Sequence, residues 1–136
     1  IGTDHAPHPA ESKECEWACA ANGMTGLEQA LSIIQMTLVE PGHITWADVA
    51  RIMSETPAKI GSLDAEQGRP LAEGEPANIV LVDPKATRVI KPEEQATKGK
   101  NNPYRGMEVP GAVRATFYAG HPTVLNGELA SPHRQA

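Results

Sequence analysis

The residues best suited to chemistry lie at positions 1–8, IGTDHAPH, where Asp4 and His8 stand four positions apart. Residues 1–3 have the character of the end of a buried strand. Pro7 must lie in a loop, because proline continues neither a sheet nor a helix. A carboxylate at the C-terminal end of a barrel strand can bind a metal ion and accept a proton from metal-bound water. An imidazole beyond the turn can donate to a substrate carboxylate or carbonyl, so this segment is a candidate active site.

A purely structural interpretation of the same residues stays open. Asp4 would then accept hydrogen bonds from amide groups of the loop, and His5 and His8 would be solvated. Two cysteines follow, Cys15 and Cys19, but three residues separate them and no second Cys/His pair completes a zinc site. We expect two reduced thiols, with a disulfide or a metal site as the alternatives.

The composition excludes several classes of partner. The 136 residues carry a net charge of −5, and no basic run is present that would neutralise the phosphates of a nucleic acid. No apolar stretch approaches the roughly 20 residues of a membrane span, and no signal peptide is recognisable. We therefore expect a cytoplasmic protein without nucleic-acid or membrane partners. Only 4% of the residues are aromatic, so its core must be aliphatic and small.

The first half of the chain is predicted to hold a long loop and a helix. Residues 9–24 are polar and irregular, and their length is typical of a loop that covers an active site. Thr25 and Glu28 have the spacing of a capping box, which predicts a helix over 26–39. Apolar residues recur there at helical spacing, in a stripe wide enough for a helix that packs on more than one side: Leu27, Ala30, Leu31, Ile33, Ile34, Leu38 and Val39.

Two further helices and a small β unit are predicted after this helix. Thr45 and Asp48 repeat the spacing of a capping box, so a second helix should begin after Thr45 and cover 46–54. Thr56-Pro57 should break it and open a short third helix over 57–61. Beyond residue 62 the chain becomes rich in turns. Four strands are predicted there, the last two forming a terminal hairpin: 79–82, 87–90, 112–118 and 123–125.

The motifs in this order resemble a known family. Residues 3–8, TDHAPH, resemble the last active-site motif of dihydroorotases, which belong to the amidohydrolase superfamily of metal-dependent barrels. Four more segments are similar to family motifs, namely a glycine loop, an "NPAKI" turn, a strand of the small β domain and an "N-T-P-F-x-G" loop: 23–28, 56–60, 68–83 and 102–107. The ordered set covers nearly the whole chain and is closest to the long bacterial, actinobacterial-looking form.

The resemblance implies a C-terminal fragment with an α/β fold. Residues 1–62 would form the last strand, the active-site loop and the helices that end a metal-dependent (β/α)8 barrel. Residues 63–136 would form part of a small β-sandwich domain. Residues 1–4 would be extended, but without upstream strands residues 1–3 would have no sheet of their own to join. We expect residues 1–3 to be disordered or paired with another chain, and we expect the helices to expose an apolar patch.

The family's functional residues can be carried over position by position. Asp4 would be a zinc ligand and the general base, and His8 would bind the carboxylate side of the substrate. The backbone at Asn22 and Gly23 would hydrogen-bond the substrate ring, and His5 would lie behind these groups. The family uses two Zn²⁺ ions, whose remaining ligands lie upstream together with a substrate arginine. We therefore expect this chain alone not to bind zinc tightly.

The implied activity is the reversible hydrolysis of the cyclic amide of dihydroorotate to N-carbamoyl-aspartate, in pyrimidine biosynthesis. The implied partners are the N-terminal part of the same enzyme, further copies of it in a homo-oligomer, and aspartate transcarbamoylase as a candidate. Two alternatives remain. One is another cyclic amidohydrolase, hydantoinase-like or allantoinase-like, although those families typically lack Ala-Pro-His after the aspartate. The other is a non-catalytic, dihydroorotase-like subunit that scaffolds a transcarbamoylase.

Overall fold

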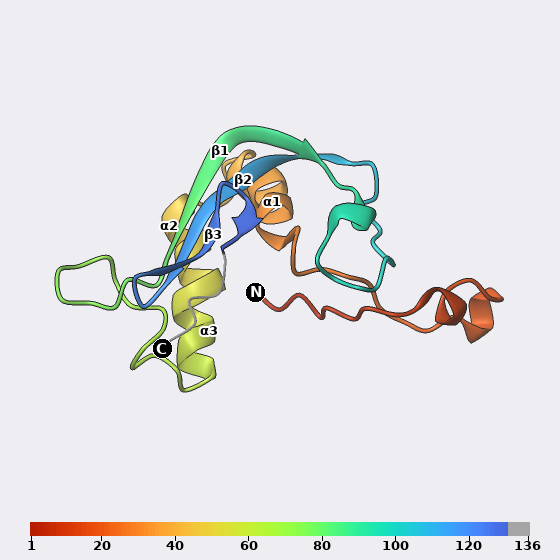
Figure 1. The fold of residues 1–136 in the computed structure, drawn as a ribbon, viewed down its shortest axis with the longest axis horizontal. Coiled ribbons are helices and arrows are strands. Elements are labelled where there is room, and N and C mark those ends of the chain that lie inside the picture. The colour runs from red at the N-terminus through yellow and green to blue at the C-terminus, as the bar shows by residue number, and fades with distance from the viewer. Residues whose placement is uncertain (131–136) are drawn as a thin grey trace.

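The computed structural model describes residues 1–130. Residues 131–136, which the polar sequence at the chain end predicts to be a frayed tail, lie outside them. The α-helices precede the strands, as expected from the sequence, and α1 and α2 lie on one side of the sheet (Figure 1). No helix within the described part is long and apolar enough to cross a membrane. The elements are the 3-10 helices η1 (Ala10–Ser12), η2 (Trp17–Cys19) and η5 (Pro92–Glu94), the π-helices η3 (Gln35–Val39) and η4 (Arg51–Glu55), the α-helices α1 (Ala30–Ile34), α2 (Trp46–Ala50) and α3 (Thr56–Ile60), and the strands β1 (Ile79–Val89), β2 (Glu108–Tyr118), β3 (His121–Leu125) and β4 (Glu128–Leu129).

The strands form one antiparallel sheet in the order β1-β2-β3-β4. The terminal hairpin is confirmed: β2 and β3 pair across a tight turn at Ala119 and Gly120, whose φ angles are 48° and 82°. The two separate strands predicted for 79–82 and 87–90 are instead one strand, β1. Its register against β2 shifts after Asp83, whose Oδ1 accepts hydrogen bonds from the amides of Lys85 and Ala86. A carboxylate that satisfies these amides lets the strand pass Pro84 as a bulge.

The capping box predicted at Thr25 and Glu28 is wrong. The helix begins at Ala30, and the hydroxyl oxygen of Thr25 is buried without a hydrogen-bond partner. The Glu28 carboxylate instead accepts hydrogen bonds from the amides of Ala96 and Thr97 and from the Thr97 hydroxyl. Partial burial raises the pKa of Glu28, but these bonds outweigh it and the net pKa is lowered. Glu28 therefore bonds to the loop at residues 96–97 instead of capping the start of the first helix.

The predicted break at Thr56-Pro57 is also wrong, because α2, η4 and α3 follow one another without interruption. The amide of Thr56 donates to the carbonyl of Arg51, five residues earlier, which is the π-helical pattern. Pro57 has no amide hydrogen to donate, and the wider π turn carries the chain past it. The helix ends at Gly61, as the sequence indicated.

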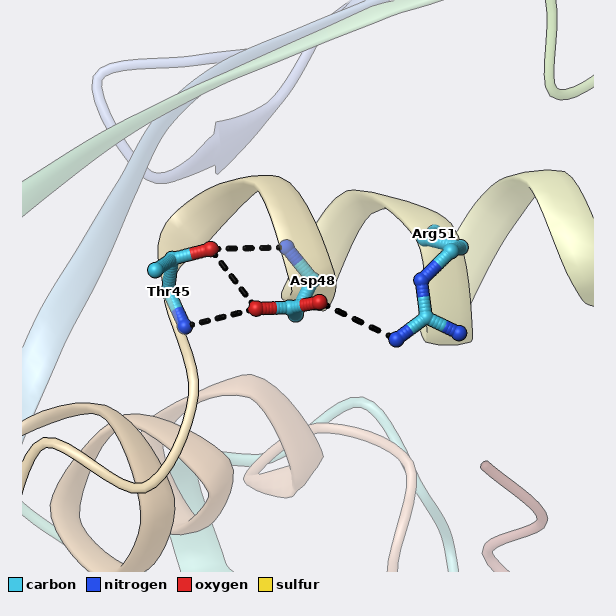
Figure 2. A network of polar contacts seen from close by, with 3 residues as sticks. All are labelled: Thr45, Asp48 and Arg51. Carbon is cyan, nitrogen blue, oxygen red and sulfur yellow. Dashed lines mark hydrogen bonds and ion pairs between the residues drawn. The ribbon is translucent and has the colours of Figure 1, made fainter.

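A second capping box was predicted at the start of this helix, and it is confirmed (Figure 2). The Thr45 hydroxyl accepts from the Asp48 amide at 3.2 Å, and Asp48 Oδ2 accepts from the Thr45 amide at 3.0 Å. Arg51 donates to Asp48 Oδ1, also at 3.0 Å. The Thr45 amide and hydroxyl, followed by Arg51, lower the pKa of Asp48 to about 2. Because this pKa lies below its ordinary value of 3.8, the network stabilises the helix above about pH 4 and is lost as the pH falls through 2.

Thr45→Ala should loosen the start of α2 in the full-length protein. Loss of an N-cap costs about 1 kcal/mol, so amide hydrogen exchange over residues 46–50 should accelerate about fivefold. Thr37→Ala is the control, because the Thr37 hydroxyl only donates to the Ile33 carbonyl within its own helix. The Asp48 carboxyl should titrate near 2 by carbon NMR. An ordinary titration near 3.8 would show that the network does not form.

The described residues bury little apolar surface. The surface area is 9580 Å², whereas a folded chain of 14.5 kDa exposes about 6,900 Å² by the usual scaling with mass. In the first helix the polar Ser32 and Gln35 are buried together with Ile34, and the two polar side chains donate to the carbonyls of Gly111 and Pro84 in the sheet. Leu27, predicted to be in the buried stripe, is 59% exposed. The buried hydrophobic residues are Ile34, Val49, Ala58, Ile90, Val109 and Ala115.

Candidate active site

The N-terminal segment lies against its own chain. Residues 1–3 form no strand, and the terminal amine donates to the Ile52 carbonyl at 2.7 Å. The segment lines a cavity with apolar side chains that include Met24 and Ile33. The expectation that it would be disordered is therefore wrong, and pairing with another chain stays a prediction. Contacts with its own second helix hold it in the absence of neighbouring strands.

Asp4 has an unusual backbone and a free carboxylate. Its φ is 46°, in the left-handed region that non-glycine residues rarely adopt, so the extended conformation expected for residues 1–4 fails at this position. The side chain is exposed and makes no hydrogen bond to any described residue. The structural alternative, in which Asp4 accepts hydrogen bonds from loop amides, does not hold. Such backbone strain is concentrated at functional sites in proteins.

His5 is engaged rather than solvated. Its Nδ1 accepts hydrogen bonds from the amides of Gly26 at 3.0 Å and Leu27 at 3.2 Å. Since Nδ1 is an acceptor, the ring of neutral His5 carries its proton on Nε2. A parallel β-bridge also joins His5 to Met24. His5 therefore fixes the segment of Asp4 to the loop that leads into α1.

The structure brings His8, Asn22 and Gly23 together. His8 Nε2 lies 2.8 Å from the carbonyl oxygen of Asn22. Gly23 has a φ of 111°, and a Cβ there would lie 2.6 Å from Ala6 Cβ and 3.4 Å from His8 Nε2. Only glycine allows this close approach of the two loops. The predicted substrate-binding groups thus share one small region, and one of them, His8, follows Asp4 by four positions in the chain.

Two residues that the sequence reasoning did not single out hold this region in place. Lys13 Nζ donates to the carbonyls of Ala21 at 2.7 Å and Gly23 at 3.2 Å. Asn101, which comes from the connection between β1 and β2, bonds to both loops. Lys13 lies within the polar loop, where a lysine carries no distinctive signal. Asn101 is 93 residues from His8, a separation that no local pattern bridges.

A cavity of about 270 Å³ adjoins His8. Of the 12 lysines and arginines of the chain, four line it, against the single carboxylate of Glu14. One of the four, Arg105, is paired with Glu93. The chain has a net charge of −5, so this concentration of positive charge is local to the candidate site. The four cations are Lys13, Lys98, Lys100 and Arg105.

The described residues do not by themselves fit a zinc site. Within residues 1–130 no group of three or more His, Cys, Asp or Glu side chains is placed to hold a metal ion. The ring nitrogens that lie nearest to Asp4 in sequence are used elsewhere, His5 Nδ1 by two amides and His8 Nε2 by Asn22. Cys15 and Cys19 are exposed free thiols. Asp4 therefore fits a metal only as one member of a larger ligand set.

Comparisons with solved structures place the fold among amidohydrolases. L-Hydantoinase (dihydropyrimidinase) from Arthrobacter aurescens superposes with a TM-score of 0.86 and 29% identity, over 96% of this chain and 29% of that protein. Dihydropyrimidinase from Brevibacillus agri gives a TM-score of 0.85 and 29% identity, over 95% of this chain and 29% of that protein. No protein-family model matches the chain.

Sequence comparisons point to dihydroorotases. The chain is 52% identical to the dihydroorotase of Leifsonia xyli and 50% identical to that of Streptomyces coelicolor, each over 129 residues and 95% of this chain. It is 45% identical to the dihydroorotase of Mycobacterium tuberculosis over the same share. The chain spans about 30% of the length of these curated relatives. It therefore fits a C-terminal fragment of an actinobacterial-type dihydroorotase, with the fold of the amidohydrolases.

Proposed function

We propose that the protein carrying this segment is a zinc-dependent dihydroorotase of pyrimidine biosynthesis, which reversibly hydrolyses the cyclic amide of dihydroorotate to N-carbamoyl-aspartate. One observation carries the proposal. In a chain 52% identical to a dihydroorotase, the His8 imidazole contacts the Asn22 carbonyl and packs against Gly23, and His8 lies four positions after the free carboxylate of Asp4. Hydrolysis needs a base at the reacting carbonyl and groups that hold the rest of the ring, and these residues meet both needs.

The proposed role of Asp4 is proton transfer. The Asp4 carboxylate takes a proton from the attacking water while the water oxygen bonds to the ring carbonyl carbon. Asp4 then gives that proton to the ring nitrogen as the carbon–nitrogen bond breaks. When bound, two zinc ions would supply a water of lowered pKa, with Asp4 as one ligand and the other ligands from the N-terminal part of the enzyme. The exposed, unbonded carboxylate of Asp4 is available for this task.

The proposed role of His8 and the backbone of Asn22 and Gly23 is substrate binding. His8 Nε2 would exchange the Asn22 carbonyl for the substrate carboxylate, because a charged acceptor forms the stronger hydrogen bond. The backbone at Asn22 and Gly23 would then hydrogen-bond the ring. The four cations around the neighbouring cavity favour an anionic substrate, which supports dihydroorotate over an uncharged ring.

A hydantoinase-like activity is the second candidate, because the superposed solved structures are hydantoinases and dihydropyrimidinases. The two can be separated by assaying the full-length enzyme with dihydroorotate and with hydantoin. We expect turnover of dihydroorotate only. Preference for hydantoin would favour the second candidate, and no turnover of either ring would favour a non-catalytic scaffold subunit.

The partners follow from the same proposal. The substrate is a small molecule, and the N-terminal part of the same enzyme would cover the helix faces that the described residues leave exposed. We propose a cytoplasmic homo-oligomer, with aspartate transcarbamoylase as a candidate partner. Size-exclusion chromatography of the full-length enzyme, alone and mixed with its transcarbamoylase, tests both associations.

His8→Ala in the full-length enzyme should raise the KM for dihydroorotate at least tenfold and change kcat little. The reason is that the variant loses a charge-assisted hydrogen bond to the substrate carboxylate and no group that transfers a proton. His43→Ala is the matched control, since His43 is an exposed histidine at the end of the first helix, outside the site. Steady-state kinetics decide the matter. A His8 variant defective in kcat alone would show that the imidazole takes part in chemistry instead.

A further inference from the structure

Asn101 makes four hydrogen bonds that join three parts of the candidate active site. Its Oδ1 accepts from the His8 amide at 3.0 Å. Its Nδ2 donates to the carbonyls of Ala6 at 2.9 Å and Gly23 at 3.3 Å. Its own carbonyl accepts from the Thr25 amide at 3.1 Å. One side chain thus bonds to both loops that carry the proposed substrate-binding groups.

The backbone around Asn101 is seated directly on the turn before His8. A Cβ at Gly99 would lie 2.7 Å from Pro7 Cβ and 2.9 Å from the His8 amide nitrogen, so no larger residue fits at this position. The same connection is anchored further back, where the amides of Ala96 and Thr97 donate to Glu28. In Figure 1 this connection, between β1 and β2, reaches away from the sheet toward the segment that leads into α1. The backbone that carries Asn101 is therefore held by the turn before His8 and by Glu28.

We propose that Asn101 is a positioning residue for substrate binding. It sets the His8 imidazole and the Gly23 backbone at the separation that the carboxylate and the ring of the substrate require. This inference rests on the proposed dihydroorotase function and adds to it a residue of the β unit.

The geometry explains why an amide side chain suits this position. The His8 amide needs an acceptor, and the Ala6 and Gly23 carbonyls need donors, so the site calls for one oxygen and one NH₂ group. Asparagine carries both on a short side chain. The Gly23 carbonyl keeps a second donor in Lys13, but the His8 amide has no other hydrogen-bond partner among residues 1–130, so His8 depends more strongly on Asn101.

The neighbouring Asn102 provides a matched control. It is 8% exposed, and its side chain bonds to Gln95 and to the Tyr104 amide, within its own loop. Asn102→Ala therefore disturbs the loop without touching the bonds to Ala6, His8 or Gly23. Any difference between Asn101→Ala and Asn102→Ala reports the bonds across to the site.

The test is steady-state kinetics of full-length enzymes with dihydroorotate. Asn101→Ala should raise KM about tenfold with kcat within about twofold of the unmodified enzyme, because the lost bonds hold substrate-binding groups. Asn102→Ala should leave KM within about twofold. The double variant His8→Ala/Asn101→Ala should have nearly the KM of His8→Ala alone, since Asn101 acts through the same binding group.

Equal effects of Asn101→Ala and Asn102→Ala on KM would overturn the inference. A double variant His8→Ala/Asn101→Ala whose increase in KM equals the product of the two single increases would also overturn it. If Asn101→Ala does not fold, the isosteric Asn101→Asp decides by the same criterion. The Asp variant keeps an acceptor for the His8 amide. It replaces the donor NH₂ group by a carboxylate oxygen, which repels the carbonyls of Ala6 and Gly23, so KM should again rise about tenfold. An unmodified enzyme inactive on dihydroorotate would refute the proposed function itself, an outcome visible before any variant is measured.

Discussion

Replacing Asp4 with Asn in the full-length enzyme is expected to lower kcat for dihydroorotate by a factor on the order of 10² or more. The amide cannot accept the proton of the attacking water, and it is a weaker ligand for a metal ion than a carboxylate. The change is nearly isosteric, and the Asp4 side chain makes no hydrogen bond to the described residues, so the fold should not be disturbed. The variant should still be saturated by dihydroorotate, because His8 and the Gly23 loop, which are proposed to bind it, remain in place.

Asp64→Asn is the matched control for this variant. Asp64 is an exposed carboxylate in the turn after α3, and only its backbone carbonyl accepts a hydrogen bond, from Arg69. It should keep full activity. Metal content measured in parallel separates the two proposed roles, because a variant with full zinc and low kcat has lost the base alone. An Asp4→Asn enzyme with unmodified kcat would remove Asp4 from the mechanism.

The second large effect concerns residues 1–136 expressed alone, which are predicted to have no dihydroorotase activity. Asp4 is the one described residue proposed as a ligand, and a single carboxylate neither holds zinc tightly nor lowers the pKa of its bound water. The exposed surface of 9580 Å² also exceeds that of a compact chain of this mass by more than a third. Large apolar residues lie on that surface, among them Leu27, Ile60 and Leu63. Such exposure favours aggregation, so the isolated chain should aggregate or lack fixed packing.

Local sequence signals predicted the elements whose stabilising contacts are local. The Thr45–Asp48 capping box and the β2–β3 hairpin are examples, since each is closed by residues a few positions apart. The signals failed where a distant segment competed. Glu28 bonds to the 96–97 loop, 68 or 69 residues away, and this contact removes the cap expected for the first helix. The break predicted at Pro57 was wrong because the helix passes through a π turn just before it. This turn lets the helix continue through a residue that has no amide hydrogen.

The candidate site was predicted in part. Asp4 and His8 were singled out by residue type and by the turn at Pro7, whereas Asn22 and Gly23 rested on the resemblance to dihydroorotases. The structure places His8, Asn22 and Gly23 together, and their functional roles stay predictions. The left-handed backbone of Asp4 had no signal in the sequence. The bonds of Asn101 had none either, because they join residues 78 to 95 positions apart. The proposed boundary between two domains near residue 62 likewise stays a prediction.

Zinc content and activity of the purified 136-residue chain, with and without the upstream part of the enzyme, test the central claim most directly. Elemental analysis should find no stoichiometric zinc in the chain alone, and cyclisation of carbamoyl-aspartate should be absent. Co-expression with the upstream part should restore both zinc binding and turnover, and Asp4→Asn in the short chain should abolish the restored activity. One or more tightly bound zinc ions in the isolated chain, or turnover by it after chelation and return of zinc, would contradict the account and require a different site built from His5, His8, Cys15 and Cys19.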